Sequence, residues 1–166
     1  MSDIYKTRYY GKYRAIVKNI KDPLELGRIQ VMCPKVLGEY LSNWCMPCLP
    51  FLGEGEGIIK IPKIGDGVWI EFEEGDLDKP IWVGGWSTPC NTPFFDYKNV
   101  DKRMCMRTKA GHLIEIDDSN NTINLNLWGG AEIHVKSDKI VIKGDLEVTG
   151  EVKPNTPIEG EKANEW

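Results

Sequence analysis

Cys45 and Cys48 form a C-x-x-C pair, an arrangement that binds zinc or carries out thiol–disulfide exchange in many proteins. Zinc binding requires a second pair of ligands, and redox activity requires a helix N-terminus that lowers the pKa of one thiol. The sequence offers neither, because the pair lies in an expected strand that Pro47 interrupts. Cys90 and Cys105 flank a connecting segment and could cross-link it. We expect the five cysteines to be mostly free thiols in a reducing cytoplasm.

The only two histidines, His112 and His134, are well separated in the sequence. His112 follows a glycine at an expected turn, and we interpret it as a partner in a turn or capping hydrogen bond. His134 alternates with Ile133 and Val135, so its side chain is expected to face outward from a strand. A threefold ring of His134 side chains that binds a metal ion or an anion is the alternative.

Carboxylates cluster at Asp117-Asp118 and at Glu73–Asp76. They could act as acid and base or bind calcium, but neither segment has the alternating ligands and the distal glutamate of an EF-hand. Gly53–Gly57 is glycine-rich but acidic, and it lacks the Gly-Lys-Ser/Thr ending of a phosphate-binding loop. We interpret these segments as polar turns and a flexible loop. The sequence therefore predicts no catalytic residues, no cofactor and no enzyme.

The chain has 166 residues, a net charge of −4, and 41% hydrophobic residues. This length suits one ordinary domain, or a small domain with an elongated segment. A mildly acidic chain has no general attraction for nucleic acid or anionic lipid, so we expect no nucleic-acid partner. No window approaches the roughly 20 apolar residues of a membrane helix, and the first residues lack the apolar stretch of a signal peptide. We therefore expect neither Sec export nor a membrane anchor.

Short runs of Ile, Val, Trp and Tyr lie between 17 glycines and 10 prolines that are spread along the chain. Such spacing leaves no room for long helices and predicts an all-β protein. After an N-terminal arm, residues 1–12, we expect a small closed barrel or sandwich over residues 13–86. The expected strands are Tyr13–Ile20, Arg28–Cys33, Trp44–Leu49, Gly57–Ile61, Val68–Phe72 and Ile81–Trp86.

Beyond an irregular connector, residues 87–104, the pattern changes to strict alternation of apolar and polar residues over residues 105–153. Turns such as Gly129-Gly130 and Gly144-Asp145 separate runs of three to six residues. Alternating strands bury one face and solvate the other. The last segment, residues 154–166, is polar and is expected to be a tail or tip.

The alternating region poses an energetic problem, because one apolar face is left without a cover. Burying an aliphatic side chain gains roughly 1.5–3 kcal/mol, whereas ordering each residue costs about 1.5 kcal/mol. A dozen apolar residues do not clearly outweigh nearly fifty ordered ones. The ribbon either folds back onto the first region or winds together with identical ribbons from other chains. We favour the second arrangement, because no helix or second sheet is left over to cover the ribbon.

Several segments resemble the central spike proteins of contractile tails, which include phage baseplate spikes and the VgrG spikes of type VI secretion. The resemblance rests on a Gly-Arg strand at Leu26–Val31, a Pro-x-x-Gly-Asp turn and strand at Pro62–Asp76, and a final strand at Lys79–Trp86. Arg107–Asp118 is similar to the segment that opens the shaft in this family. The barrel residues that carry the motif are Gly27, Arg28, Trp44, Gly65, Asp66, Phe72, Gly75, Asp76, Pro80 and Gly84.

The resemblance implies an OB-like barrel followed by a trimeric, triple-stranded β-helix or prism. Three apolar faces would meet in a dry axial core. That core would contain Ile123, Leu125, Leu127, Ile133, Val135, Ile140, Ile142, Leu146 and Val148.

In this family the spike is mechanical: sheath contraction drives it through the target cell envelope. The resemblance implies a homotrimer that contacts baseplate hub and tube proteins and that can hold a tip protein at its C-terminus. It also implies assembly in the cytoplasm of the producing bacterium and incorporation into a phage tail or another contractile particle.

The sequence departs from some members of this family in two ways. Residues 87–104 leave no room for the lysozyme domain that some members insert between barrel and shaft. The chain also lacks the His-x-His pair that holds iron at some tips, although a tip metal ion is not ruled out. An alternative function is an OB-fold module that binds an oligosaccharide or nucleic acid and uses the alternating region as an oligomerisation tail.

Overall fold

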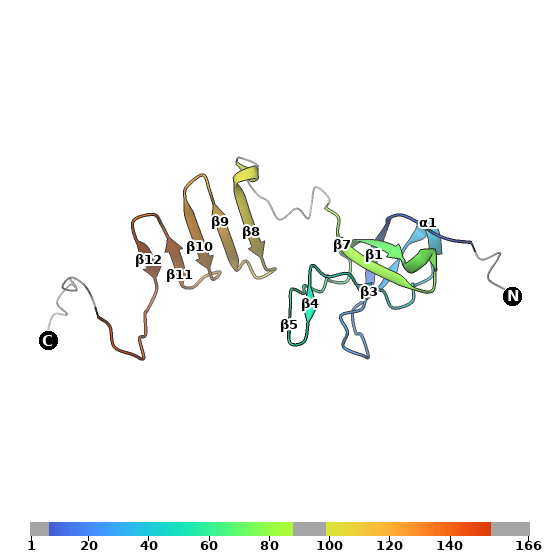
Figure 1. The fold of residues 1–166 in the computed structure, drawn as a ribbon, viewed down its shortest axis with the longest axis horizontal. Coiled ribbons are helices and arrows are strands. Elements are labelled where there is room, and N and C mark those ends of the chain that lie inside the picture. Colours follow the sequence, from blue (N-terminus) through green and yellow to red (C-terminus); the bar gives the residue numbers. More distant parts are fainter. Residues whose placement is uncertain (1–6, 88–98, 154–166) are drawn as a thin grey trace. The chain divides into compact units, whose positions relative to one another are not determined.

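The computed structural model describes residues 7–87 and 99–153 (Figure 1). The chain divides into two compact units, Met1–Thr92 and Pro93–Trp166. Each unit is built on its own antiparallel or mostly antiparallel sheet. The chain is mostly β-structured, which confirms the predicted class.

The sheet of the first unit has five strands in the order β2-β1-β6-β7-β3. Neighbouring strands are antiparallel, except that β3 runs parallel to β7. The strands are β1 (Tyr13–Asn19), β2 (Gln30–Met32), β3 (Met46–Pro47), β6 (Gly67–Phe72) and β7 (Pro80–Gly85). Five of the six strands predicted for this region are present, most of them shorter than expected.

Two isolated bridges curl this sheet toward a barrel. Ile29 pairs with Cys45, and Met32 pairs with Leu41, so the segment that leads into β3 also lies beside β2. The same segment continues on the other side, where Cys48 N–H donates to the Trp82 carbonyl at 2.9 Å. This curled half-barrel is consistent with the OB-like barrel expected from the sequence.

The core of the first unit follows from the period-two alternation of its strands. In β6, Val68, Ile70 and Phe72 point inward, while Trp69 and Glu71 face outward and are half-buried. The buried apolar side chains come from β1, β2, β6 and β7 and from residues next to these strands. They are Ala15, Val17, Ile29, Val31, Cys33, Cys45, Val68, Ile70, Phe72 and Trp82.

The strand predicted at Gly57–Ile61 is wrong, because the glycine-rich stretch before it forms a hairpin. β4 (Leu52–Gly53) and β5 (Glu56–Gly57) pair around a tight turn, and Gly55 has φ +75°. A glycine adopts this left-handed conformation without the steric cost that a side chain would bring. The turn uses the residues that the sequence reading assigned to a flexible loop, so residues 58–61 lie outside any strand.

Short helical turns connect the strands of the first unit. α1 (Pro34–Leu37) starts with a proline at its first position, where the missing N–H has no intrahelical partner to lose. A 3-10 turn, η1 (Glu73–Gly75), follows β6. Within the described ranges, no helix has the length and apolar character needed to span a membrane.

The second unit is a five-stranded antiparallel meander with the order β12-β11-β10-β9-β8. A 3-10 turn, η2 (Val100–Lys102), precedes it. The strands are β8 (Arg103–Arg107), β9 (Leu113–Asp117), β10 (Thr122–Asn126), β11 (Glu132–Val135) and β12 (Ile140–Lys143). The sheet begins at Arg103, inside the stretch that the sequence reading gave to the connector.

Gly67 offers a direct test of packing on the outer side of the barrel. A Cβ added at Gly67 would lie 2.4 Å from a ring carbon of Trp86, whereas a Cβ at Gly85 would have its nearest neighbour at 3.7 Å. These two glycines lie close together on paired strands. Gly67→Ala should therefore lower the free energy of unfolding by about 1–3 kcal/mol, because an overpacked site forces its neighbours to move.

The measurement is urea denaturation followed by tryptophan fluorescence, with Gly85→Ala as the matched control. The control should lie much closer to the original chain. Equal stability of Gly67→Ala and Gly85→Ala would show that the Trp86 ring does not pack over Gly67.

Candidate assembly interface

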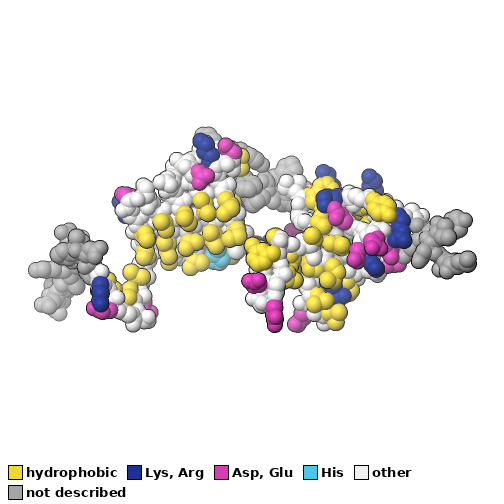
Figure 2. Space-filling view, viewed as in Figure 1, with side chains coloured by type: hydrophobic (Ala, Val, Ile, Leu, Met, Phe, Trp, Pro, Cys, Tyr) yellow, Lys and Arg dark blue, Asp and Glu magenta, His cyan; other side chains and the backbone are white. Residues whose placement is uncertain are grey.

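One face of the second sheet carries ten apolar side chains in two cross-strand rows. The first row is Met106, Ile114, Leu125, Ile133 and Ile142, in which each residue pairs directly with the next. The second row is Met104, Ile116, Ile123, Val135 and Ile140. We call these ten residues the apolar face. Figure 2 shows hydrophobic side chains gathered over this unit.

Among the described residues of the second unit, 99–153, none covers the apolar face. Met104 and Ile140, on the two edge strands, are 65% and 64% exposed. Leu125, on the central strand, is still 41% exposed. Apolar side chains of a sheet that packs against another layer would be largely buried. The face therefore has the exposed, apolar character of a protein–protein interface.

The opposite face of the same sheet is a connected network of polar side chains. Arg103 pairs with Glu115, and Asn124 Nδ2 donates to Glu115 Oε2 at 3.1 Å. Asn124 Oδ1 lies 2.8 Å from His134 Nδ1, so the network passes from β8 to β11 without a break. Most of the described polar side chains of this face are thus joined by hydrogen bonds or ion pairs.

The network continues to the edge strand β12. His134 Nε2 lies 2.8 Å from Glu132 Oε2, which also accepts from Lys143 Nζ at 2.7 Å. The hydrogen bond from Lys143 has the largest effect and that from His134 the next largest, and together they hold the pKa of Glu132 below its ordinary value. The position of His134 on the polar face agrees with the outward orientation expected from alternation. The sequence does not show that it would be tied to two strands.

The structure places the predicted axial-core residues in two groups. Six of them lie on the apolar face: Ile123, Leu125, Ile133, Val135, Ile140 and Ile142. Leu127, Leu146 and Val148 lie beyond the ends of β10 and β12, outside any strand. Whether these nine residues meet on a threefold axis stays a prediction.

Sequence reasoning missed part of the apolar face. Met104 and Met106 were assigned to the connector and the start of the shaft, but they form the β8 contribution to the two rows. Ile114 and Ile116 were recognised as alternating but were not placed in the core. The signal was present in the Arg-Met-Cys-Met-Arg stretch at Arg103–Arg107, which alternates with period two.

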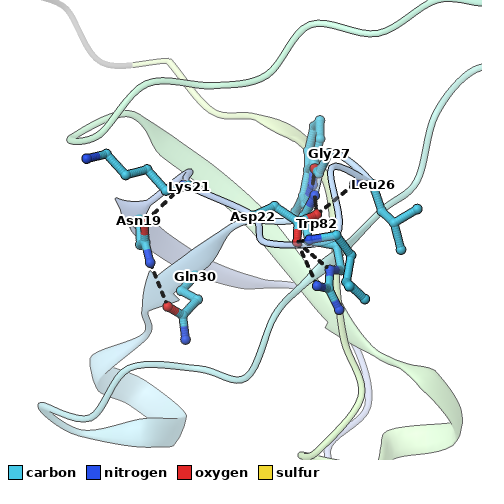
Figure 3. A network of polar contacts seen from close by, with 9 residues as sticks. Asn19, Lys21, Asp22, Leu26, Gly27, Gln30 and Trp82 are labelled. Carbon is cyan, nitrogen blue, oxygen red and sulfur yellow. Dashed lines mark hydrogen bonds and ion pairs between the residues drawn. The ribbon is translucent and has the colours of Figure 1, made fainter.

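The barrel motif is held together by a half-buried ion pair at the turn before β2 (Figure 3). Asp22 Oδ1 accepts from Arg28 Nη2 at 2.6 Å and Nε at 3.0 Å. The Asp22 carboxylate also accepts backbone N–H groups of Leu24, Leu26 and Arg28. The Arg28 guanidinium, together with these N–H donors, holds the pKa of Asp22 well below its ordinary range.

Aromatic residues complete this end of the barrel. The Arg28 guanidinium lies 5.5 Å from the ring centroid of Trp44, and Trp82 Nε1 donates to the Gly27 carbonyl at 3.2 Å. Gly27 has φ +75°, and a Cβ there would lie 2.9 Å from Ile59 Cδ1. The motif residues Gly27, Arg28 and Trp44 therefore shape one turn rather than a ligand site.

The two Gly-Asp pairs of the motif are also turns. Asp66 Oδ2 accepts from the Lys63 N–H at 2.8 Å, and Gly65 N–H donates to the Val17 carbonyl at 2.9 Å. Gly75, with φ +74°, accepts at its carbonyl from Tyr9 N–H at 2.9 Å. Asp76 Oδ1 accepts from the Asp78 N–H at 3.2 Å.

The remaining motif residues pack the barrel. The Phe72 ring lies 6.1 Å from that of Tyr9 and 5.7 Å from that of Tyr13, centroid to centroid. Pro80 is fully buried, and Gly84 has φ +143° where β7 shifts its register against β6. These motif residues therefore pack or shape the barrel, and the contacts described for them indicate no catalytic or ligand-binding role.

A reactive cysteine has a lowered thiol pKa, whereas the pKa of Cys45 in this pair is raised. Cys45 is buried, and its Sγ lies 3.4 Å from Ser42 Oγ. Burial raises the pKa of the Cys45 thiol to about 11, so it is protonated at neutral pH. Cys48 is exposed, while Cys90 lies outside the described residues. Across residues 7–87 and 99–153, no three His, Cys, Asp or Glu side chains form a group that could hold a metal ion.

His112 occupies the turn role that the sequence predicts. Its Nδ1 accepts from the Trp128 N–H at 3.2 Å, and its own backbone N–H donates to Thr108 Oγ1 at 3.2 Å. Asp117 likewise caps a turn, because its carboxylate accepts the backbone N–H groups of Ser119 and Asn120. The side chain of Asn120 also donates to Asp117, which lowers the pKa of that carboxyl.

Asp22→Asn should reduce the stability of the barrel in a pH-dependent way. The pKa of Asp22 is depressed from 3.8, so its ion pair stabilises the fold above about pH 4, and this contribution is lost as the pH falls further. The urea midpoint of Asp22→Asn should therefore lie below that of the original chain at pH 7, and the difference between the two midpoints should be smaller at pH 3. Glu54→Gln, on the exposed hairpin, is the control. A gap of equal size at both pH values would contradict the proposed role of the charge.

Comparison with known proteins identifies the first unit. Residues 13–86 match the family of Type VI secretion system/phage-baseplate injector OB domains. Over 90 residues, 52% of this chain, it is 31% identical to the actin cross-linking toxin VgrG1 of Vibrio cholerae serotype O1 (strain ATCC 39541 / Classical Ogawa 395 / O395). The match spans only 8% of that much longer relative. Residues 13–86 are therefore similar to the injector OB domains of phage baseplates and type VI secretion systems, as the sequence motif predicted.

Proposed function

We propose that this protein is a non-enzymatic central spike of a contractile injection tail. In this proposal three copies place their apolar faces together to form the shaft, and the OB domains dock the shaft on the baseplate hub. Contraction of a sheath then drives the shaft into the target cell envelope. The family of residues 13–86 supports a place in a tail or injection apparatus.

The observation that carries the proposal is the uncovered apolar face. Its ten side chains belong to a single-layer sheet whose other side is closed by its own polar network. A single layer has no interior, so burying this face requires another surface. Three identical faces around one axis would remove all of them from water together.

The rows of the apolar face suit such a shaft. Cross-strand neighbours are spaced about 5 Å apart along the meander, so each row forms a continuous ridge. Ridges from three copies can interdigitate over five successive strands. The polar network then faces outward, where Arg103, Glu132 and Lys143 keep the surface solvated.

The structural role of the barrel rests on its motif. The motif residues hold turns and pack the core, as Arg28 illustrates by pairing with Asp22. We propose hub and tube proteins as the partners of the barrel, and a tip protein as a possible partner of the C-terminal segment. In this proposal the protein assembles in the cytoplasm of the producing bacterium and becomes part of the particle.

Ile142→Asp should abolish trimer formation, because it places a carboxylate inside the proposed dry axis. The matched control is Val141→Asp, which makes the same type of change at the neighbouring residue of β12 on the opposite face. Multi-angle light scattering should give three chain masses for the original protein and for Val141→Asp, and one for Ile142→Asp. Circular dichroism checks that the barrel remains folded.

Two results would contradict the proposal. A monomeric original chain at micromolar concentration would remove the shaft altogether. A trimer that tolerates Ile142→Asp as well as Val141→Asp would show that the chains associate through another surface.

A further inference from the structure

The imidazole ring of His134 lies between two oxygen atoms on the polar face of the second sheet. Its Nδ1 lies 2.8 Å from Asn124 Oδ1 on β10, and its Nε2 lies 2.8 Å from Glu132 Oε2 on its own strand, β11. Both distances are those of short hydrogen bonds. The His134 side chain is only 20% exposed, so these two oxygens are its main hydrogen-bond partners.

Both of these oxygen atoms are acceptors of hydrogen bonds. The Asn124 amide presents its oxygen to His134 because its Nδ2 donates to Glu115 Oε2 at 3.1 Å, and Glu115 also pairs with Arg103. Turning the amide over would place its oxygen against the Glu115 carboxylate, where two acceptors would meet with no proton between them. The Glu132 carboxylate is an acceptor too. Each ring nitrogen of His134 therefore needs a proton to make its contact favourable.

A neutral imidazole has one N–H group and one bare nitrogen, so it cannot donate to both oxygens. With the proton on Nδ1, the lone pair of Nε2 would face the Glu132 carboxylate. With the proton on Nε2, the lone pair of Nδ1 would face Asn124 Oδ1. A half-turn of the ring would bring carbon atoms to both positions and lose both hydrogen bonds. The imidazolium form, in contrast, donates from both nitrogens.

We propose that His134 is an imidazolium in the folded protein at neutral pH, and that its second proton ties three strands of the polar face together. The ring joins β11 to β10 through Asn124. Through Glu132, which also accepts from Lys143 Nζ at 2.7 Å, it joins β11 to β12. Hydrogen bonds that involve ionised groups are stronger than those between neutral groups. The inference concerns the sheet of one chain and does not rest on the association of three copies.

The charges around the ring favour this state. Alternation places four charged residues on this side of β10–β12 and of the turn between β11 and β12: Glu132, Lys136, Lys139 and Lys143. Among the described residues, Glu132 is the charged side chain in direct contact with the ring. Lys136 and Lys139 are exposed and lie one residue pair further along, about 7 Å away by the rise of a strand. Coulomb energy falls with distance and in water, so the carboxylate outweighs them.

The other histidine of the chain gives this proposal an internal control. His112 Nδ1 accepts from the Trp128 N–H, so this ring needs a bare Nδ1. NMR of the full-length protein with isotope-labelled histidine reads the protonation of each ring nitrogen. An ordinary imidazole is about nine-tenths neutral at pH 7.5. At this pH both nitrogens of His134 should carry a proton, while His112 should show one protonated and one bare nitrogen.

Glu132→Gln should release the second proton of His134 at pH 7.5. The glutamine amide can donate to a bare Nε2, and Asn124 still accepts from Nδ1, so the neutral ring then satisfies both contacts. Glu147→Gln removes a carboxylate of the same unit outside its strands and is the matched control. It should leave both protons in place.

The role of the proton in holding the strands together is tested by melting, followed by circular dichroism. His134→Gln should melt at a lower temperature than the original chain at pH 7.5. Stability that depends on a bound proton is lost as the pH rises. The gap in melting temperature should therefore close at the alkaline pH at which NMR shows the His134 ring to be neutral.

Three results would overturn the proposal. The first is a bare nitrogen on His134 at pH 7.5 in the original chain. The second is a His134 ring that stays doubly protonated in Glu132→Gln, because Glu132 would then not hold the charge. The third is a gap in melting temperature that is unchanged once the ring is neutral. All three can be read in a trimer or a monomer, so light scattering decides the spike proposal separately.

Discussion

A single-layer sheet with one apolar face cannot satisfy that face by itself, and the second unit of this protein depends on this constraint. Ten side chains in two cross-strand rows face solvent. The other face is closed by a chain of polar contacts from Arg103 to Lys143. Contact with water is favourable for the polar face and unfavourable for the apolar face. An exposed apolar face of this size is typical of a surface that packs against another one, which the proposed shaft would supply.

The first unit, in contrast, buries its apolar side chains within itself. Its sheet curls until Ile29 reaches Cys45, so the apolar sides of its strands bury one another. Turns set this curvature, and the Asp22–Arg28 pair holds the most elaborate of them with both side-chain and backbone contacts. Several motif residues of the barrel, among them Gly27, Asp66 and Gly75, lie at turns.

The two units suggest a division of labour in a tail assembly. A self-sufficient barrel can fold before assembly and present a defined docking surface. In the proposed shaft, the apolar face of the second sheet would be buried only when copies meet, so the stability of this sheet would depend on trimer formation.

The sequence by itself determined the β class, the barrel span and the alternation that defines the apolar face, because these depend on local spacing and turn residues. It also predicted the turn roles of His112 and Asp66, which follow from neighbouring backbone. Only the tertiary structure decided that Met104 and Met106 join the apolar rows, that residues 52–57 form a hairpin, and that Asp22 pairs with Arg28. These features depend on which strands become neighbours and on how turns bend the chain. An alternating stretch or a glycine-rich stretch does not by itself fix which residues pair across a turn or a sheet, so only the folded chain shows these pairs.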